Sequence, residues 1–271
     1  MREGVIYVAQ GPDYLDLAIQ SAGSLKRHNP EIAAEVFTDQ PCDSPCFDRV
    51  LPIPDGPTPK LACLPESRFQ RTLYLDCDTV ILAPLGDLFD ILERFPLAVA
   101  HDVRRTSNLI REGGDHDTPY AFPQLNGGVI LYRDSAEVRS FLLNWQVQYR
   151  KLARKRDQVS LRDLLWSSDL RFYVLPPEFN LRRVTMLDAW EPLDVRPTIM
   201  HSHRLLQHMR MGDVRLSTLA EVLPAERIAL AEEWDAVLGP LAAPGETADP
   251  TERFSIAEAG ERSPAQGPSD E

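Results

Sequence analysis

The sequence predicts an α/β fold in which helices flank a mixed, mostly parallel sheet within a single domain. The chain opens with an apolar segment, 4–9, then a helical repeat of apolar residues over 14–28 and a second apolar segment, 34–39. A strand, a helix and a strand in this order are typical of a parallel sheet. A third apolar segment ends at two aspartates within 73–78 and indicates another buried strand.

The later elements follow from the same apolar patterns, with Pro30 and Pro84 as breaks. Residues 40–59 are rich in proline, and we expect them to be irregular. We expect helices over 60–69, 85–95, 134–152, 157–166 and 218–238, and strands over 80–82, 97–102, 125–132, 171–175 and 198–201.

The chain is expected to divide into a domain, residues 1–240, and a tail, residues 241–271. The tail is rich in Pro, Gly, Ser and Glu and poor in large apolar residues. Such a composition cannot bury enough apolar surface to fold, so the tail is predicted to be disordered.

Composition limits the classes of function. The 271 residues are 43% hydrophobic and carry a formal net charge of −12. A nucleic-acid-binding protein presents a basic surface, so we expect no nucleic-acid partner. No apolar run approaches the roughly 18 residues that span a bilayer, and residues 1–4 lack a signal-peptide profile. The expectation is therefore a cytoplasmic protein without a transmembrane segment.

The four cysteines do not predict a zinc site. Cys42 and Cys46 are four residues apart, but no second pair follows at zinc-site spacing, so these two with Cys63 and Cys77 are interpreted as ordinary thiols.

Asp76 and Asp78 carry the chemistry that the sequence indicates most clearly. They stand where a buried strand should end. Alternate residues of a strand share one face and lie about 7 Å apart at the backbone, so the two carboxylates can converge on one cation. Oxygen ligands suit Mg²⁺ or Mn²⁺. A cation at the carboxyl end of a strand in an open α/β sheet is well placed to hold phosphates, which predicts a metal-and-diphosphate site.

Two other interpretations of this motif stay open. An aspartate after a strand is ordinary turn chemistry. The segment 76–80 also resembles the opening motif of haloacid-dehalogenase-like phosphatases, which would make Asp76 a nucleophile and Asp78 an acid or base. That motif usually follows the first strand of its domain, whereas at least two predicted strands precede it here.

Glycines mark the start of the strand predicted over 125–132. Gly127 and Gly128 follow Asn126, and glycine there permits close approach of the backbone to a ligand or to another strand.

Five segments occur in the order typical of one family. They are Lys60, sixteen residues before Asp76, the strand 73–82 with its Asp-Cys-Asp-Thr, the Leu-Asn-Gly-Gly-Val of 125–129, Asp157-Gln158, and His201. Over residues 4–205 the chain resembles the retaining family-8 glycosyltransferases, which include glycogenin-like and bacterial lipopolysaccharide enzymes. The resemblance implies the Rossmann-like GT-A nucleotide-diphospho-sugar fold.

The resemblance also implies a function. The chain would transfer a hexose from a UDP-sugar to a glycan, lipid or small-molecule acceptor, with retention at the anomeric carbon. Asp76, Asp78 and His201 would hold Mn²⁺ or Mg²⁺, and Gln158, Asp157 and Lys60 would surround the donor sugar as catalytic candidates. The implied donor-binding residues are Ala9, Gln10, Gly11, Tyr14, Lys60, Asp76, Cys77, Asp78, Asp102, Asn126, Gly127 and Arg204.

The chain departs from the family at three places. The segment 201–210 lacks the Lys-Pro-Trp that holds phosphate in the family, and Arg204 or Arg210 could substitute for it. The basic segment 154–156 replaces an acidic residue near Asp157, and the polar loop 103–122 matches nothing specific. A non-catalytic nucleotide-sugar-binding relative therefore stays open as an alternative. A nucleotidyltransferase is disfavoured because the turn after the first strand lacks a Gly-rich loop.

Overall fold

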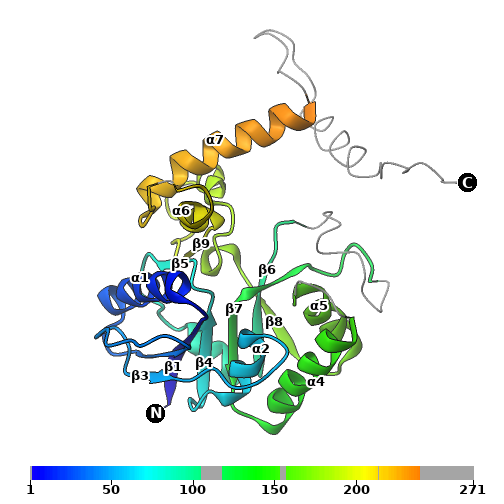
Figure 1. Ribbon diagram of the computed structural model, residues 1–271. Helices are drawn as coiled ribbons and strands as arrows, with labels where there is room; N and C mark the ends of the chain where they lie inside the picture. The colour runs from blue at the N-terminus through cyan, green and yellow to red at the C-terminus, as the bar shows by residue number, and fades with distance from the viewer. Residues whose placement is uncertain (1, 105–117, 153–156, 213, 239–271) are drawn as a thin grey trace, which may run out of the picture.

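A seven-stranded mixed sheet forms the centre of the molecule (Figure 1), in a computed structural model that describes residues 2–104, 118–152, 157–212 and 214–238. The strand order is β3-β2-β1-β4-β7-β6-β8, and β7 alone among these seven runs opposite to the others. The strands are β1 (Glu3–Ala9), β2 (Ala33–Thr38), β3 (Arg49–Leu51), β4 (Arg71–Leu75), β6 (Leu97–His101), β7 (Leu125–Arg133) and β8 (Phe172–Leu175). The mixed, mostly parallel sheet predicted from the sequence is confirmed.

The central strands β1, β2, β4, β6 and β7 are buried on both faces, which explains why they are mostly apolar, whereas the edge strands β3 and β8 are partly exposed. Successive side chains of a strand point to opposite faces. In β1, Val5 and Tyr7 belong to one hydrophobic cluster, while Ile6 between them belongs to another. The sheet therefore separates two cores.

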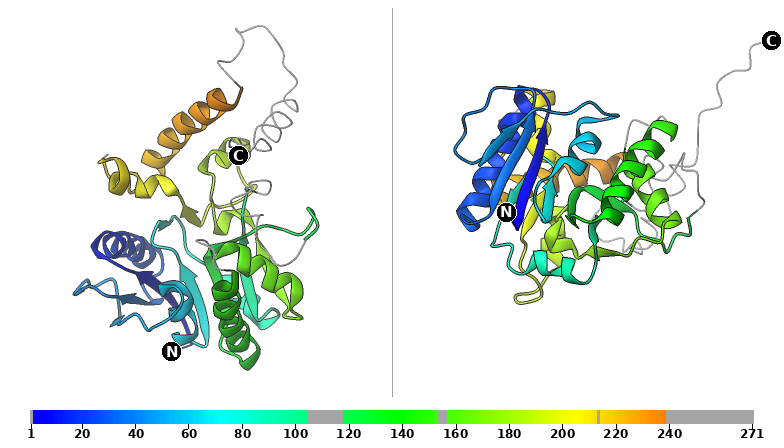
Figure 2. Two further views of the ribbon diagram at one scale, coloured as in Figure 1. Left: turned by 45° about the vertical axis from the view of Figure 1, so that its right-hand side comes forward. Right: turned by 90° about the horizontal axis from the view of Figure 1, so that it is seen from below.

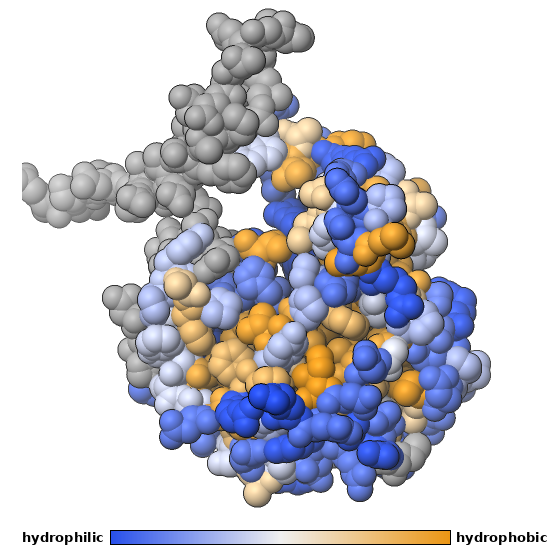
Figure 3. Space-filling view, turned by 180° about the vertical axis from the view of Figure 1, so that it is seen from behind, coloured by the Kyte–Doolittle hydropathy of each residue, from blue (hydrophilic) through white to orange (hydrophobic). Residues whose placement is uncertain are grey.

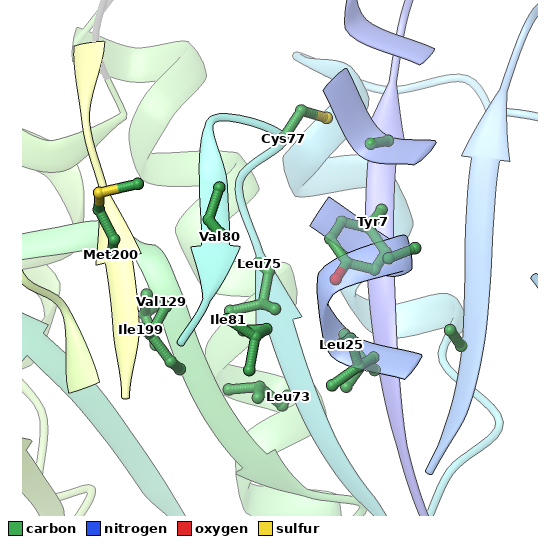
Figure 4. Packing of buried hydrophobic residues seen from close by; sticks show 14 of the residues in the cluster. Tyr7, Leu25, Leu73, Leu75, Cys77, Val80, Ile81, Val129, Ile199 and Met200 are labelled. Atoms are coloured by element: carbon green, nitrogen blue, oxygen red, sulfur yellow. The ribbon is translucent and has the colours of Figure 1, made fainter. Parts of the chain in front are cut away.

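The first face is covered by α1 (Pro12–His28) and by a second, two-stranded sheet of β5 (Thr79–Ile81) and β9 (Ile199–His201). Figure 4 shows Leu25 of α1 near Leu73 of β4 and Ile81 of β5, with Ile199 and Met200 of β9 farther along the same core. Helix α1 starts directly after Gly11, whose φ of 83° lies in the left-handed region that favours glycine. Pro12 is tolerated in the first turn of α1, because the backbone N–H that proline lacks would have no hydrogen-bond partner within the helix at that position.

The second face is covered by α2 (Pro59–Cys63), α4 (Ala136–Leu152) and α5 (Gln158–Ser167). Trp145 of α4 is 1% exposed within this core, and its indole Nε1 donates to Ser160 Oγ at 3.0 Å. This bond ties α4 to α5 at the end of α5 that begins with Gln158.

The short helical elements and α7 complete the fold. They are η1 (Leu64–Glu66), η2 (Leu88–Glu93), η3 (Pro177–Phe179), η4 (Val184–Ala189), η5 (His203–Leu206), α6 (Gln207–Met211) and α7 (Leu219–Leu238). In Figures 1 and 2, α7 extends away from the sheet beyond α6. Its start is a capping box, because Thr218 Oγ1 accepts from Glu221 N while Glu221 Oε2 accepts from Thr218 N.

Several expected elements differ from those observed. The helix expected over 60–69 ends at Cys63 and tightens into η1, where Pro65 lies, and the helix expected over 85–95 is the 3₁₀ helix η2. The segment 40–59 holds a short strand, β3, that its proline content obscured. The tail 241–271 and most of the loop 103–122 lie outside the described residues.

The surface combines both kinds of side chain. Seen from behind in Figure 3, hydrophobic residues gather in the middle of the body and hydrophilic residues form its lower border. No helix in the described ranges is long and apolar enough to span a membrane.

Candidate metal centre and cleft

The pairing of β5 with β9 brings His201 to the two aspartates. Asp76 and Asp78 follow β4 in a tight turn, which β5 continues directly. The antiparallel register sets Thr79 opposite His201. A histidine far along the chain therefore lies at the carboxyl end of β4, at the edge where parallel strands place ligand sites.

The three side chains form a cluster that fits a divalent cation. One ligand atom from each of Asp76, Asp78 and His201 can be chosen so that all lie within 4.8 Å of one another. His201 Nε2 is 3.3 Å from Asp78 Oδ1 and 3.8 Å from Asp76 Oδ2. Two carboxylates and one imidazole that can reach the same ion are a suitable ligand set for a divalent cation such as Mn²⁺.

Asn180 fixes the orientation of the His201 ring. Its Oδ1 lies 2.8 Å from His201 Nδ1, and its Nδ2 donates to the carbonyl of His101 at 3.3 Å. Because an amide oxygen can only accept, Nδ1 carries a proton and donates it to Asn180 Oδ1, so Nε2 is the ring nitrogen that faces the carboxylates. A histidine held in this way is preorganised as a ligand.

Gly128 gives the imidazole its space. A Cβ at this position would lie 2.1 Å from His201 Cε1 and 2.7 Å from Asp76 Oδ2. The absence of a side chain at Gly128 thus leaves room for the side chains of two candidate metal ligands, whereas approach to a bound ligand stays a prediction.

Asp78 is an ionised carboxylate in spite of its burial. Burial alone would raise its pKa, but the charge of His201, hydrogen bonds from His201 and His203, and the charge of Arg182 together hold the pKa well below its usual range. The carboxylate is therefore available as a ligand at neutral pH.

Lys60 lies beside the candidate metal centre. Its Nζ is 2.9 Å from Asp157 Oδ2 and 3.7 Å from Asp76 Oδ1. Burial would lower the pKa of Lys60, but the charges of these two aspartates outweigh burial and raise it above its ordinary value. Tyr74 hydroxyl donates to Asp76 Oδ1 at 2.5 Å, which fixes that carboxylate from a third side.

A second polar network centres on Asp102. Its Oδ2 accepts from Gln158 Nε2 at 2.9 Å and from Asn126 Nδ2 at 3.2 Å, and it forms an ion pair with Arg104 at 3.2 Å. Burial would raise the pKa of Asp102, yet the bonds from Arg104 and Gln158 hold it well below its ordinary value. Asp102 is thus a fixed acceptor that orients both amide side chains, and the oxygen of Asn126 accepts from Gly128 N in turn.

The three candidate metal ligands, Lys60, Tyr74, Asn126, Asp157 and Gln158 line one open cleft of about 520 Å³, a size typical of small-molecule sites. Its lining includes most of the residues singled out in the sequence, namely Gln10, Tyr14, Lys60, Asp76, Cys77, Asp78, Asn126, Asp157, Gln158 and His201. Tyr14 is 43% exposed there, so its ring does not lie in the core.

Comparison with known proteins gives a fold. No protein-family model and no curated protein sequence matches the chain. Among solved structures, the glycosyltransferase GlyE of Streptococcus pneumoniae TIGR4 is similar with a TM-score of 0.54 and 18% identity, over 90% of this chain and 67% of GlyE. The galactosyltransferase LgtC, solved with donor and acceptor sugar analogues, has a TM-score of 0.54 and 16% identity, over 86% of this chain and 99% of LgtC.

The chain has the GT-A fold. The fold class that the sequence predicted is thereby confirmed, and at these identities the likeness extends to the fold alone. A second structure of GlyE, without ligand, gives the same TM-score of 0.54 over 87% of this chain and 64% of GlyE. In this GT-A fold the candidate metal cluster follows a central strand.

Five residues proposed for the donor do not line the cleft: Ala9, Gly11, Asp102, Gly127 and Arg204. Ala9 is buried, and Gly11 donates its amide to Asp39 Oδ1 at 2.8 Å. Arg204 instead lies within 3.7 Å of Glu226 and 3.6 Å of Glu233.

The structure adds residues to the cleft that the sequence did not single out. Arg104, Tyr149 and Arg182 line it, together with His203, which lies two residues after His201. Asn180 and Arg182 flank Leu181, which is fully buried. A buried apolar residue between two polar ones is typical of an extended segment whose alternate side chains share a side. This pattern was the sequence signal that could have placed Asn180 and Arg182 on one side.

Proposed function

We propose that this chain is a metal-dependent glycosyltransferase that transfers a hexose from a UDP-sugar to a glycan, lipid or small-molecule acceptor, with retention at the anomeric carbon. The observation that supports it best is the convergence of Asp76, Asp78 and His201 within 4.8 Å beside the cleft of a GT-A fold. Three candidate ligands from two distant segments meet there. If Asp76 and Asp78 served only to form the turn after β4, no histidine would be needed beside them.

Asp76, Asp78 and His201 would hold the cation, for which we propose Mn²⁺ or Mg²⁺. When bound, such an ion neutralises diphosphate charge and stabilises the negative charge that develops on the departing UDP. The orientation of His201 by Asn180 supports this assignment, because ring nitrogens that ligate metals are usually fixed by a partner on the other nitrogen.

The remaining cleft residues fit the binding of a sugar nucleotide. Gln10 and Tyr14 stand at one part of the lining and would contact the nucleotide. Lys60 and Asp157, paired at 2.9 Å, would contact the sugar and its phosphate. Gln158, held by the ionised Asp102, presents an oriented amide, and we propose that it lies near the anomeric carbon.

A thermal-shift screen of nucleotide sugars, with and without Mn²⁺, tests the proposal. A ligand that binds the folded state raises the apparent stability, so the true donor stands out from the others. We expect UDP-sugars to raise the melting temperature more with Mn²⁺ than without it, and Asp78→Ala to abolish that difference. Metal-independent nucleotide binding would contradict the proposal.

Two further assays separate the alternatives. Slow hydrolysis of the bound donor, measured as released UDP, is expected of a transferase, whereas a non-catalytic relative would bind without turnover. A phosphatase would hydrolyse generic phosphate esters and form a trapped aspartyl-phosphate analogue at Asp76. Three strands precede β4 in the chain, so the Asp76 position does not favour the phosphatase.

A further inference from the structure

Arg182 is a buried cation that forms no direct ion pair with a carboxylate among the described residues, although its charge and that of Asp78 lie near enough to interact. Its residue surface is 6% exposed. Nη1 donates to the carbonyl of His201 at 3.2 Å, Nη2 contacts the ring nitrogens of His203, and Nε is buried without any hydrogen-bond partner. A buried charge is ordinarily paired by direct contact, so a guanidinium without such a contact suggests that a ligand supplies it.

The backbone explains why Arg182 stands at the site. The segment 180–182 runs beside β9, with Leu181 N bonded to the carbonyl of Ile199 and His201 N bonded to the carbonyl of Leu181. Alternate residues of an extended segment share a side. Asn180 therefore meets the His201 ring, and Arg182 meets the His201 carbonyl.

Arg182 and Lys60 approach the candidate metal cluster at different carboxylates. Lys60 lies 3.7 Å from Asp76 Oδ1. His203 Nδ1 lies 3.7 Å from Asp78 Oδ2 and carries the contact to Arg182. Arg182 also lines the cleft. An anion held at the cluster would thus lie in a cleft that both cations line.

The neighbouring arginines are already neutralised. Arg104 pairs with Asp102 at 3.2 Å. Arg204 and Arg183 both pair with Glu226, at 3.7 and 3.8 Å, and with Glu233, at 3.6 Å. Within the described part of the cleft wall, Arg182 is the arginine whose charge has no such partner.

We propose that Arg182 binds a phosphate of the donor diphosphate, in the place that the sequence left to Arg204 or Arg210. This inference rests on the proposed function. The His203 side chain is 51% exposed and accepts at the guanidinium as a neutral ring, so it can turn into the cleft and leave Nη2 to a phosphate oxygen. Guanidinium and phosphate form charge-assisted, often bidentate, hydrogen bonds that a neutral imidazole cannot match.

Titration of UDP and of uridine in the presence of Mn²⁺ tests this role. For Arg182→Gln we expect the affinity for UDP to fall about 10- to 100-fold, the range of a lost charge-assisted contact, while uridine binding changes less than about 2-fold. Arg182→Lys keeps the positive charge but not the paired N–H donors of the guanidinium, so its UDP affinity should fall by an intermediate amount. Arg183→Gln is the matched control, one residue away and outside the cleft lining, and should bind UDP as the wild type does.

The outcomes separate this inference from the proposed function. If the wild type does not bind UDP, the proposed function fails. If the wild type binds UDP and Arg182→Gln binds it equally well, the assignment of Arg182 fails while the proposed function stands. If Arg182→Gln does not fold, Arg182→Lys tests the assignment instead: a fall in UDP affinity without a matching fall in uridine affinity supports it, and unchanged UDP affinity contradicts it. A loss of UDP affinity of the same size in Arg204→Gln, with Arg182→Gln unaffected, returns the role to Arg204.

Discussion

Asn180 Oδ1 accepts the Nδ1 proton of His201 at 2.8 Å and so directs Nε2 toward Asp78. Neither residue could do this alone, because a free imidazole samples other rotamers and tautomers. The segment 180–182 and β9 are hydrogen-bonded to each other, so the pair is set by backbone pairing. The geometry makes Asn180 a residue that acts on metal binding through another side chain.

Replacing Asn180 should weaken metal binding without removing a candidate ligand. For Asn180→Ala we expect Mn²⁺ affinity to fall about 10- to 100-fold, as is typical when the partner of a ligating histidine is lost. Isothermal titration with Mn²⁺ measures the effect. Asn180→Asp keeps an acceptor for His201 Nδ1 and should retain affinity closer to the wild type. Equal affinities in Asn180→Ala and the wild type would show that the ring needs no such support.

Gly127 and Gly128 offer a matched pair of substitutions. A Cβ at Gly128 would meet His201 Cε1 at 2.1 Å and the carboxylate of Asp76 at 2.7 Å, and neither group can move without breaking the cluster. A Cβ at Gly127 would meet the tip of Lys60 at 2.9 Å, and a long flexible chain can shift. We expect Gly128→Ala to lose Mn²⁺ binding and about 1–3 kcal/mol of unfolding free energy, as overpacking does.

Gly127→Ala should bind Mn²⁺ with nearly wild-type affinity. Urea unfolding and Mn²⁺ titration of both variants check this contrast. The interpretation of Gly128 is wrong if its alanine variant binds Mn²⁺ as tightly as the Gly127 variant does.

Local patterns made the central sheet and the aspartate pair predictable. Strands buried on both faces are mostly apolar, as in β1 and β4, and the end of β4 is marked by Asp76 and Asp78. The α1 pattern is equally clear, because its apolar residues recur at helical spacing between Pro12 and Asn29. These signals each need fewer than twenty neighbouring residues.

The rest of the site depends on contacts that no local pattern encodes. Asn180 and Arg182 reach the cleft only because their segment lies beside β9, and β9 lies there only because it pairs with β5. Arg204 has the right chemistry for phosphate, but Glu226 of α7 pairs with it. These partners belong to separate segments of the chain, so local sequence patterns could not predict their pairing.

The four cysteines should react with a thiol reagent in two classes. Cys42 and Cys46 are partly exposed, whereas Cys63 and Cys77 are buried. Burial, with a further contribution from Glu66, raises the pKa of Cys63 to about 12, and the thiolate is the reactive form. We expect two thiols to react quickly in the native protein and two only on unfolding. The double variant Cys42→Ser/Cys46→Ser should lack the fast phase, and a fast phase that persists in it would contradict the burial of Cys63 and Cys77.

Asp102 should make the stability of the chain depend on pH in acid. Bonds from Arg104 and Gln158 outweigh burial and hold its folded-state pKa below the ordinary value of about 3.9. Such a carboxylate stabilises the folded state above its unfolded pKa, and this contribution is lost as the pH falls through the folded pKa. The difference in unfolding free energy between the wild type and Asp102→Asn should therefore be largest above about pH 5 and shrink toward about pH 2. Urea unfolding across this range measures it.

Asp188→Asn is the control. Asp188 pairs with Arg227 at the exposed surface, where solvent screens the charges, so the difference in unfolding free energy between the wild type and Asp188→Asn should stay small at every pH. A difference for Asp102→Asn that does not change with pH would mean that the carboxyl is not held ionised by its partners.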